Sequence, residues 1–550
     1  MNHSKYRPFQ AVQINNRQWP SRMITRAPIW CSVDLRDGNQ AIPVPMTVAQ
    51  KMEMFQILVR CGFKEIEVGF PAASLTEYEF VRRLIEEGLI PEDVTIQVLV
   101  QAREELIERT IDSLVGARRV IIHMYNSTSP VQREVVFGMT KSQIVELAVR
   151  GTQWIKEYSA KLPGTEVLFQ YSPESFSATE VEFSLEICEA VVGAWLPFYP
   201  QTMIINLPET VEVAMPNIYA DQIEWFCSNF KHRNRVIISL HTHNDRGTGV
   251  AATELGILAG ADRVEGTLFG NGERTGNVDI ITVALNLYTQ GIEPGLDFSD
   301  LDSVREVYER CTGMRVPVRQ PYSGELVFTA FSGSHQDAIR KGLHAMAANS
   351  AETAKWNVPY LVMDPADVGR KYKEVVIRVN GQSGKAGISW LLECKCGINM
   401  PKAMQAEFGS VIQPKIDALG REVTAEDLKA MFWKEYVERE VPYKLVSFQT
   451  NEDSGTHYCH SIITLNGEKL QSSGLGNGPI SAFINSLKDL EINVSVLDQS
   501  EHALGVGEEA SAIAYVQLQF SNGKTRWGAG VDTSIDNASI KAVISALNRE

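Results

Sequence analysis

Residues 119–125 read Arg-Val-Ile-Ile-His-Met-Tyr, residues 166–171 read Glu-Val-Leu-Phe-Gln-Tyr, and the amphipathic segment Lys141–Ala160 lies between them. The two short runs are rich in β-branched and aromatic residues, which favour strands, and the longer segment has apolar residues at helical spacing. A strand, a helix and a second strand in this order are typical of a β–α–β unit with parallel strands. This stretch therefore predicts an α/β fold.

The same alternation extends in both directions, from residue 28 to about residue 290. Further helical patterns occur at Val48–Cys61, Tyr78–Glu87 and Asp221–Phe230. The predicted strands are Ile29–Leu35, Glu65–Phe70, Thr95–Val100, Arg119–Tyr125, Glu166–Tyr171, Thr202–Leu207, Arg235–His241 and Arg263–Leu268. Eight strands, each followed by helix-patterned sequence, predict a closed (β/α)8 TIM barrel. The alternative is a doubly wound open sheet, but the chain has no dinucleotide-binding fingerprint to support it.

Four regions follow from this reading: an N-terminal arm (1–27), a catalytic barrel (28–322), helical linker subdomains (323–438) and a C-terminal α+β domain (439–550). The last region contains a duplicated ββα unit, with an Asn-Gly pair at Asn466 in the first copy and at Asn522 in the second. Asn-Gly between two β runs predicts a type I′ hairpin turn. Because this region has no second acid–base cluster, we interpret it as regulatory or assembling.

The composition is that of an ordinary soluble globular protein, with 550 residues of which 44% are hydrophobic and 22% charged. The formal net charge of -15 argues against nucleic-acid binding. No apolar run approaches the roughly 18 residues that a membrane-spanning helix needs. The eight cysteines are scattered and no signal peptide is recognisable, so we expect free thiols and a cytoplasmic location.

Two motifs that lie far apart in the sequence predict a metal site. Arg36–Gln40 (Arg-Asp-Gly-Asn-Gln) follows the first strand, and His241–Asp245 (His-Thr-His-Asn-Asp) ends the seventh. His241 and His243 point to the same face of a strand, so both can reach one ion, and Asp37 completes three ligands. This set suits Zn²⁺, Mn²⁺ or Co²⁺, and Mg²⁺ can also use it when a substrate supplies oxygens. On an isolated strand, the same histidine pair would be structural or incidental.

Other polar residues also follow the strands, where the active sites of such barrels lie. They are Arg36, His123, Glu174, Thr210, Glu273 and Asn277. Arg36 is suited to stabilising an enolate or alkoxide oxygen beside the metal, although an ion pair with a barrel carboxylate is an alternative. His123 can equally be a core histidine, and Glu174 can pair with a loop arginine. The glycine-rich stretch Gly266–Asn277 predicts a backbone that approaches a ligand or turns sharply.

Four ordered motifs together resemble a known enzyme family. They are Arg36–Gln40, Leu207–Thr210 (Leu-Pro-Glu-Thr), His241–Asp245 and Gly270–Asn277 (Gly-Asn-Gly-Glu-Arg-Thr-Gly-Asn). They are similar to the 2-isopropylmalate synthase family, metal-dependent acyl-CoA condensing barrels related to the homocitrate and citramalate synthases. The similarity covers essentially the whole chain, because Gly476–Ile480 in the duplicated tail resembles the leucine-sensing regulatory domain of that family.

The resemblance implies an acyltransferase that condenses acetyl-CoA with 3-methyl-2-oxobutanoate in a Claisen-type reaction. Thioester hydrolysis then gives 2-isopropylmalate and CoA, the first committed step of leucine biosynthesis. The implied cofactor is a divalent metal ion (Mg²⁺, Mn²⁺ or Zn²⁺), and acetyl-CoA is the co-substrate. The implied partners are small molecules, leucine as an allosteric effector and a second copy of the chain in a homodimer, with no nucleic acid and no membrane.

The resemblance also implies roles for individual residues. The metal ligands are Asp37, His241, His243 and Asn277. The substrate-binding residues are His123, Thr210 and Glu273. The catalytic residues are Arg36, Glu174, His335 and Tyr360. His335, in the segment Gly333–Asp337, would be the base, Glu174 would orient it, and Tyr360 would come from the partner subunit. From the residues alone, His335 is only a histidine in a polar loop.

Two alternatives remain open at this point. A homocitrate or citramalate synthase type of condensation, with 2-oxoglutarate or pyruvate as acceptor, would share every metal motif. A catalytically silent barrel that serves as an amino-acid-binding scaffold belongs to a different class of protein. Loss of a ligand or of the base would indicate such a scaffold, and all the expected residues are present in the sequence.

Overall fold

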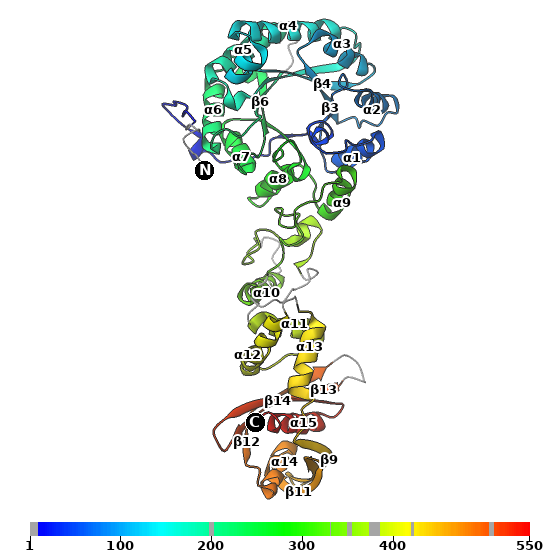
Figure 1. Ribbon diagram of the computed structural model, residues 1–550, viewed down its shortest axis with the longest axis vertical. Helices are drawn as coiled ribbons and strands as arrows, with labels where there is room; N and C mark the ends of the chain where they lie inside the picture. The colour runs from blue at the N-terminus through cyan, green and yellow to red at the C-terminus, as the bar shows by residue number, and fades with distance from the viewer. Residues whose placement is uncertain are drawn as a thin grey trace. The chain divides into compact units, whose positions relative to one another are not determined.

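The computed structural model of the chain describes residues 9–196, 203–330, 332–348, 355–372, 385–419, 423–504 and 511–550. The chain divides into two compact units (Figure 1). The first unit contains Met1–Phe328 and Met363–Tyr372, and the second contains Thr329–Val362 and Lys373–Glu550. The eight-stranded barrel and the C-terminal sheets therefore belong to different units.

The first unit is built on a closed barrel of eight parallel strands in sequence order. The strands are β1 (Ile29–Ser32), β2 (Glu65–Gly69), β3 (Thr95–Gln101), β4 (Arg119–Ser127), β5 (Glu166–Glu174), β6 (Met203–Glu209), β7 (Val236–Thr242) and β8 (Arg263–Gly266). Strand β1 pairs with both β2 and β8, with Ile29 opposite Arg263, and so closes the sheet. The predicted (β/α)8 fold is confirmed, and the open-sheet alternative is wrong because no barrel strand is left at an edge.

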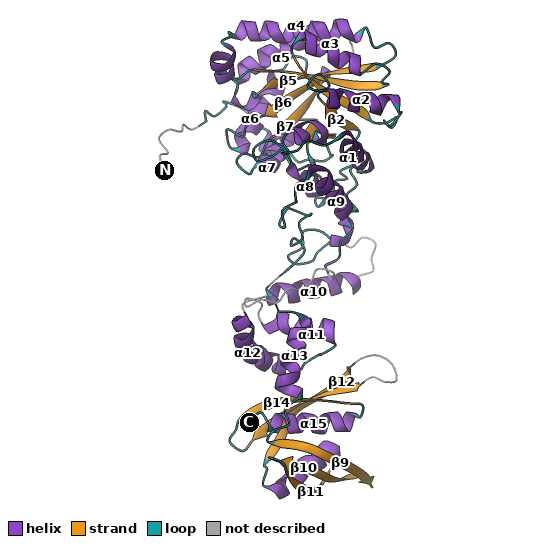
Figure 2. Ribbon diagram, turned by 45° about the vertical axis from the view of Figure 1, so that its right-hand side comes forward, coloured by secondary structure: helices purple, strands orange, loops and turns teal. Residues whose placement is uncertain are grey.

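Helices surround this barrel on its outside, as Figures 1 and 2 show. They are α1 (Val48–Arg60), α2 (Leu75–Glu86), α3 (Glu104–Ser113), α4 (Lys141–Ser159), α5 (Val181–Trp195), α6 (Pro216–Asn229), α7 (Gly249–Ala259) and α8 (Ile280–Tyr288), and α9 (Leu301–Thr312) packs on α1. Thr47 begins α1 and Thr140 begins α4 through capping boxes with a glutamine three residues later. Each box satisfies N–H groups that the first turn of a helix leaves unpaired.

The interior of the barrel is polar rather than filled only by branched apolar side chains. Glu67, Gln97, Gln170, Arg263 and Glu265 are all fully buried there. Their hydrogen bonds cross the barrel, since Gln170 on β5 donates to Glu265 on β8 over 2.7 Å. Barrel interiors are ordinarily layers of Val, Ile and Leu. A buried polar layer of this kind costs stability unless its members are paired, so its presence points to a function.

The N-terminal arm lies on α6 of the barrel. The Arg17 guanidinium donates to Asp221 over 2.6 and 2.7 Å, and the Trp19 indole donates to the same carboxylate over 2.8 Å. The backbone N–H groups of Gln18 and Trp19 donate to Glu224. The basic charge of the arm is therefore matched by acidic residues on one helix.

In the part of it that the structure describes, the second unit has two antiparallel sheets of three strands, one helix at the end of each repeat, and four further α-helices before the first repeat. These four helices are α10 (Gly333–Ala348), α11 (Lys385–Cys396), α12 (Lys402–Leu419) and α13 (Ala425–Phe432). The first repeat contains β9 (Tyr443–Asp453), β10 (Thr456–Leu465), β11 (Glu468–Gly476) and α14 (Pro479–Leu487). The second repeat contains β12 (Val494–Leu504), β13 (Ser511–Phe520), β14 (Thr525–Asp532) and α15 (Ile535–Leu547). The duplication is thus present, and each copy has one more strand than the sequence predicts. The added strands, β9 and β12, are polar and largely exposed edge strands with a weak apolar signal.

The two predicted Asn-Gly turns differ. Asn466 (φ 51°) and Gly467 (φ 94°) both have positive φ, as a type I′ turn requires. In the second copy only Gly523 does (φ 80°), so the prediction of a type I′ turn there is wrong. The Asn522 side chain instead accepts a hydrogen bond from the Lys524 N–H over 2.9 Å, which holds a different turn.

The linker helices and the second repeat share one apolar core. Phe408, Phe432 and Tyr436 pack in the same buried cluster as Tyr515 and Trp527. Within the part of the chain that the structure describes, no helix is both long enough and apolar enough to cross a bilayer. The seven cysteines with described side chains are free thiols.

Candidate active site

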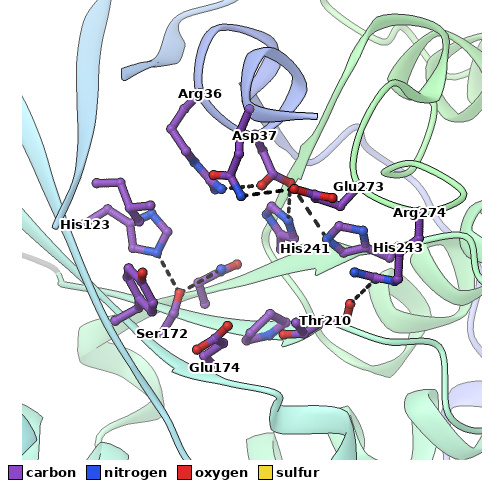
Figure 3. Close-up of a pocket in the computed structure, with 15 residues that line it drawn as sticks. Arg36, Asp37, His123, Ser172, Glu174, Thr210, His241, His243, Glu273 and Arg274 are labelled. Carbon is purple, nitrogen blue, oxygen red and sulfur yellow. Dashed lines mark hydrogen bonds and ion pairs between the residues drawn. The ribbon is translucent and has the colours of Figure 1, made fainter. Parts of the chain in front are cut away.

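Three residues of the sequence motifs converge at the C-terminal ends of β1 and β7 (Figure 3). One ligand atom from each of Asp37, His241 and His243 lies within 4.8 Å of the other two. Asp37 Oδ2 is 3.3 Å from Nε2 of His241 and 3.8 Å from Nε2 of His243. All three side chains are buried, so the group forms a compact site with little access to bulk water.

Asp37 is positioned by a π-helical turn, Asp34–Gly38, that follows β1. The buried Asp34 carboxylate accepts a hydrogen bond from the Leu268 N–H over 3.0 Å, and Asn271 Nδ2 donates to the Gly38 carbonyl over 3.0 Å. Both contacts join the loop after β1 to the loop after β8. Closure of the barrel between these two strands therefore brings Asp37 to the two histidines at the C-terminal end of β7.

The unpaired polar atoms around this group fit a bound cation. Asp37 Oδ2 and Asn277 Oδ1 are buried acceptors that form no hydrogen bond with the described residues. Leaving a buried acceptor unpaired costs about 1–3 kcal/mol, which a cation among these atoms would offset. Two imidazole nitrogens and a carboxylate form a donor set that divalent ions such as Zn²⁺ and Mn²⁺ accept. The residues present therefore fit the predicted metal.

The three ligand residues shift one another's pKa values. Burial lowers the pKa of His241, but its contacts with Asp37 and Glu265 outweigh this and raise it to about 9. Burial and the neighbouring His241 lower the pKa of His243 to about 4. Although burial opposes it, Arg36 and the histidines hold the pKa of Asp37 well below its usual range. Ligation of a metal ion through Nε2 would require the neutral form of the His241 ring.

A buried carboxylate fixes the orientation of His241. Glu265 Oε2 lies 2.9 Å from His241 Nδ1, and Arg263 Nη1 donates to Glu265 Oε1 over 2.7 Å. Glu265 and Arg263 are both fully buried. A carboxylate on one ring nitrogen sets the tautomer so that the other nitrogen can act as a ligand. Nε2 of His241 consequently faces Asp37.

Arg36 borders the pocket (Figure 3). Its guanidinium lies between the carboxylates of Asp37 and Glu67. Its Nε donates to Glu67 and its Nη1 donates to Asp37. Burial lowers its pKa, but Asp37 and Glu67 more than compensate and raise the pKa above the ordinary value. The ion pair with a barrel carboxylate, which the sequence left as an alternative, is thus present. A guanidinium has five N–H groups, so donors remain for a substrate oxygen.

His123 contacts the protein through both ring nitrogens. Its Nδ1 lies 2.6 Å from Glu67 Oε2, and its Nε2 lies 2.7 Å from Ser172 Oγ. The ring is 3% exposed and borders the pocket beside Ser172. His123 is therefore both a buried core residue and a residue of the pocket wall, so the two alternatives that the sequence offered for it do not exclude each other.

A cavity of about 310 Å³ lies above these residues. It is lined by Arg36, Asp37, Gln40, Leu99, His123, Tyr125, Ser172, Glu174, Asn206, Pro208, Thr210, His241, His243, Glu273 and Arg274. Every barrel residue expected in the site lines it except Asn277. Its volume is at the lower end of the range for ligand pockets, so it suits a small acid better than a bulky ligand.

Three lining residues are held by hydrogen bonds to neighbouring loops. The Ser127 hydroxyl donates to Glu174, and the Gln40 amide donates to Glu273 over 3.4 Å. Thr210 Oγ1 accepts the N–H of Ser175 over 2.9 Å, which leaves its own O–H for a ligand. The polar ends of these side chains are therefore oriented before any ligand binds.

The glycine-rich loop after β8 turns sharply at Gly276. This residue has a φ of 98°, and a β carbon there would lie 1.9 Å from the carbonyl oxygen of Gly270. Only glycine fits such an approach. The Gly276 carbonyl accepts the N–H of Asn244 over 3.0 Å, and Asn277 pairs with the backbone of His243. The turn thus places Asn277 beside a metal-site histidine, although outside the lining of the cavity.

His335 and Tyr360 lie together in the second unit. Their rings stack with centroids 4.0 Å apart and an interplanar angle of 23°. Both side chains are exposed, and Tyr360 is 64% exposed with a φ of 63°. Positive φ is uncommon for a tyrosine, and such conformations occur at turns and cluster at active sites. The structure brings these two predicted residues to each other, in a different unit from the other predicted site residues.

Sequence reasoning missed several residues of the site. Ser172 and Asn206 line the cavity, and Glu67, Gln97 and Glu265 support it from below. Gln97, Ser172 and Asn206 interrupt largely apolar strands with a polar side chain, and Ser172 and Asn206 stand two positions before a residue that also lines the cavity. Side chains two residues apart in a strand point to the same face, so counting back from Glu174 and Pro208 would have predicted that Ser172 and Asn206 also face the cavity.

The barrel and its ligand set define a metal-dependent (β/α)8-barrel enzyme. The HMGL-like family model matches residues 27–307. The models of the alpha-isopropylmalate synthase post-catalytic domain and of the LeuA allosteric (dimerisation) domain match residues 325–393 and 422–550. The chain belongs to the 2-isopropylmalate synthase family, since it shares about half of its residues with enzymes of that name over their full length.

Two of these relatives come from different bacteria. A 2-isopropylmalate synthase of Clostridium acetobutylicum is 52% identical over 100% of this chain and 99% of its own length. One from Pseudomonas entomophila is 54% identical over 99% of this chain and 97% of its own length. Among solved structures, an HMG-CoA lyase from Acenitobacter baumannii, in complex with coenzyme A and 3-methylmalate, is 19% identical with a TM-score of 0.43, over 53% of this chain and 93% of that one.

Proposed function

We propose that this chain condenses acetyl-CoA with 3-methyl-2-oxobutanoate and hydrolyses the thioester, to give 2-isopropylmalate and CoA in the first committed step of leucine biosynthesis. The observation that carries the proposal is the meeting of Arg36 with Asp37, His241 and His243 in one cavity of about 310 Å³. The name and the full-length identity of the relatives support the choice of acceptor.

The barrel residues bind and orient the 2-oxo acid. When bound by Asp37, His241 and His243, with Asn277 beside them, a divalent ion supplies Lewis-acid polarisation of the keto group. Arg36 donates to the keto oxygen, whose negative charge grows as the new bond forms. His123 and Thr210 hold the carboxylate of the acid. Glu273 shapes the side of the pocket that receives acetyl-CoA.

His335 is the proposed base. Its imidazole removes a proton from the methyl group of acetyl-CoA, and the resulting carbanion forms a bond to the keto carbon of the acceptor. The keto oxygen then takes up a proton to become the hydroxyl of the product. Water cleaves the thioester, and CoA leaves as the thiol. Glu174 orients the base. Because the thioester methyl group is a very weak acid, close approach of the two substrates matters more than the strength of the base.

Tyr360 is proposed to act at the active site of the partner subunit, in a homodimer. Because His335 stacks on Tyr360, we extend this proposal to His335: a subunit that supplies Tyr360 to its partner's active site would supply His335 to the same site. Each active site of the dimer would combine the barrel of one subunit with the His335–Tyr360 pair of the other.

Mixing two inactive variants tests this arrangement. We expect Asp37→Asn and His335→Gln chains, each inactive alone, to regain about one quarter of wild-type activity when refolded or co-expressed in equal amounts, because half of the dimers then contain one intact site out of two. CoA release by the purified mixed dimer is the measurement. No recovery in verified mixed dimers would mean that His335 serves the barrel of its own chain.

We further propose the division into the arm (1–27), the catalytic barrel (28–322), the linker subdomains (323–438) and a regulatory domain (439–550) that binds leucine. The match of residues 422–550 to an allosteric and dimerisation domain supports the last assignment. We also propose a cytoplasmic location, which agrees with the seven free thiols of the described cysteines.

An assay of CoA-thiol release from acetyl-CoA tests the proposed function. The acceptors are 3-methyl-2-oxobutanoate, 2-oxoglutarate and pyruvate, each with and without EDTA and leucine. We expect release to be fastest with the branched acid, to stop with EDTA and to fall with leucine. Preference for another acid would indicate a homocitrate or citramalate synthase. No release with any acceptor in Mg²⁺, Mn²⁺ or Zn²⁺ would favour the silent scaffold.

A further inference from the structure

Two buried carboxylates below the cavity serve different parts of the site. Glu67 on β2 contacts Arg36 and His123. Glu265 on β8 contacts the metal-site residue His241 and the buried Arg263. Both carboxylates are fully buried. One carboxylate thus orients the groups proposed to meet the substrate oxygens, and the other orients a proposed metal ligand.

Gln97 on β3 is hydrogen-bonded to both carboxylates. Its Nε2 donates to Glu67 Oε2 over 2.6 Å and to Glu265 Oε1 over 3.1 Å. Its Oε1 accepts from Arg263 Nη2 over 2.9 Å, and the whole side chain is fully buried. A single amide therefore joins the Arg36–His123 side of the site to the His241 side.

The other buried amide of the barrel interior makes a contrast. Gln170 on β5 donates to Glu265 Oε1 over 2.7 Å, and its Oε1 is without a hydrogen-bond partner among the described residues. Its Nε2 thus contacts the carboxylate on the metal side of the site. The two glutamines are the same residue type, equally buried, and differ in whether they also reach Glu67.

The Gln97 amide lies between the Glu67 and Glu265 carboxylates, where it can reduce the repulsion between them. Two ionised carboxylates that approach in a low-dielectric interior repel each other. An amide N–H group donated to both lowers this repulsion and fixes the distance between them. Networks of this kind act together, since each bond polarises the next. Removing the amide would let the two carboxylates and the groups they hold relax independently.

We propose that Gln97 is a positioning residue that couples the metal side of the site to the side that binds the oxo acid. This inference rests on the proposed function, because it takes the roles of Arg36 and His241 from there. Gln97 itself acts through Glu67 and Glu265 and does not line the cavity.

The test compares Gln97→Met with Gln170→Met in the full-length protein. Replacing a group that supports a metal ligand typically costs about 10- to 100-fold in metal affinity or activity. We expect Gln97→Met to weaken Mn²⁺ binding, measured by titration calorimetry, and also to raise the KM for 3-methyl-2-oxobutanoate and lower kcat. We expect Gln170→Met to weaken Mn²⁺ binding while the KM for the oxo acid stays at the wild-type value. A purely structural role would lower the thermal midpoint of both variants without this split.

Three outcomes would overturn the proposal. They are wild-type metal affinity and KM in Gln97→Met, the same pattern in both glutamine variants, and a loss confined to thermal stability. If Gln97→Met does not fold, Gln97→Leu is a second apolar variant that removes the amide donor without adding a charge, and the same split is expected of it. Failure of the proposed function is distinguishable, because the wild-type chain would then bind no Mn²⁺ or release no CoA.

Discussion

Replacing Asp37 with Asn is expected to abolish tight binding of a divalent metal and to lower the condensation rate by roughly 10²–10³-fold, the equivalent of several kcal/mol of lost electrostatic stabilisation. Asp37 is the one carboxylate among the three converging ligands, and it lies within 4 Å of both histidine Nε2 atoms. An asparagine amide carries no charge to offset the cation. Its NH₂ group would also face the metal position with hydrogen atoms where Asp37 presents a carboxylate oxygen. Calorimetric titration with Mn²⁺ and CoA release measure the two effects.

Asp112→Asn provides the matched control. Asp112 is exposed on α3, away from the cavity, so the same chemical change there should leave both metal binding and turnover at wild-type values. The assignment of Asp37 as a ligand would be wrong if Asp37→Asn bound Mn²⁺ with wild-type affinity. Restored activity at high metal concentration would instead support it, since a weakened site can still be filled.

Replacing Arg36 with Gln is expected to lower kcat by about 10²–10³-fold, as removal of a fixed oxyanion donor does in other enzymes. The guanidinium is buried between Asp37 and Glu67, and its pKa is raised, so it carries its charge throughout the pH range of the reaction. The charge on the keto oxygen appears only as the carbon–carbon bond forms. The loss should therefore fall mainly on kcat and less on the KM of the oxo acid.

Arg36→Lys separates charge from geometry. Lysine keeps the positive charge but cannot contact Asp37 and Glu67 in the forked manner of a guanidinium, so we expect only partial recovery of kcat. Arg60→Gln, on the exposed side of α1, is the control and should behave as wild type. An unchanged kcat in Arg36→Gln, with metal binding intact, would remove Arg36 from the chemical step and leave it as an ion-pair partner.

Much of the barrel and of its ligand set is predictable from the sequence because the signals are local. Strand and helix periodicities are properties of short segments, and the eight alternations of residues 28–290 predict the closed barrel that the structure contains. The i, i+2 spacing of His241, in β7, and His243, one residue beyond the end of β7, lets both imidazoles reach Asp37 for the same reason. The Gly-rich loop was recognisable because backbone approaches such as that of Gly276 exclude every other residue.

Local signals failed where an element depends on its neighbours. The edge strands β9 and β12 have polar, exposed sequences and exist because they pair with β10 and β13. The second Asn-Gly turn adopts another geometry because the Asn522 side chain bonds to the backbone of Lys524. In both cases a contact that is absent from the linear pattern decides the conformation.

By itself, the sequence determined the barrel class, the duplicated tail and the residue types able to hold a metal, because periodicity and ligand chemistry belong to single segments. The tertiary structure alone decided which of these residues meet. Closure between β1 and β8 brings Asp37 to the two histidines at the end of β7. Across the barrel interior, hydrogen bonds connect Gln97 with Glu67 and Glu265. Contacts between distant strands follow from the geometry of the closed sheet, and no local pattern encodes them.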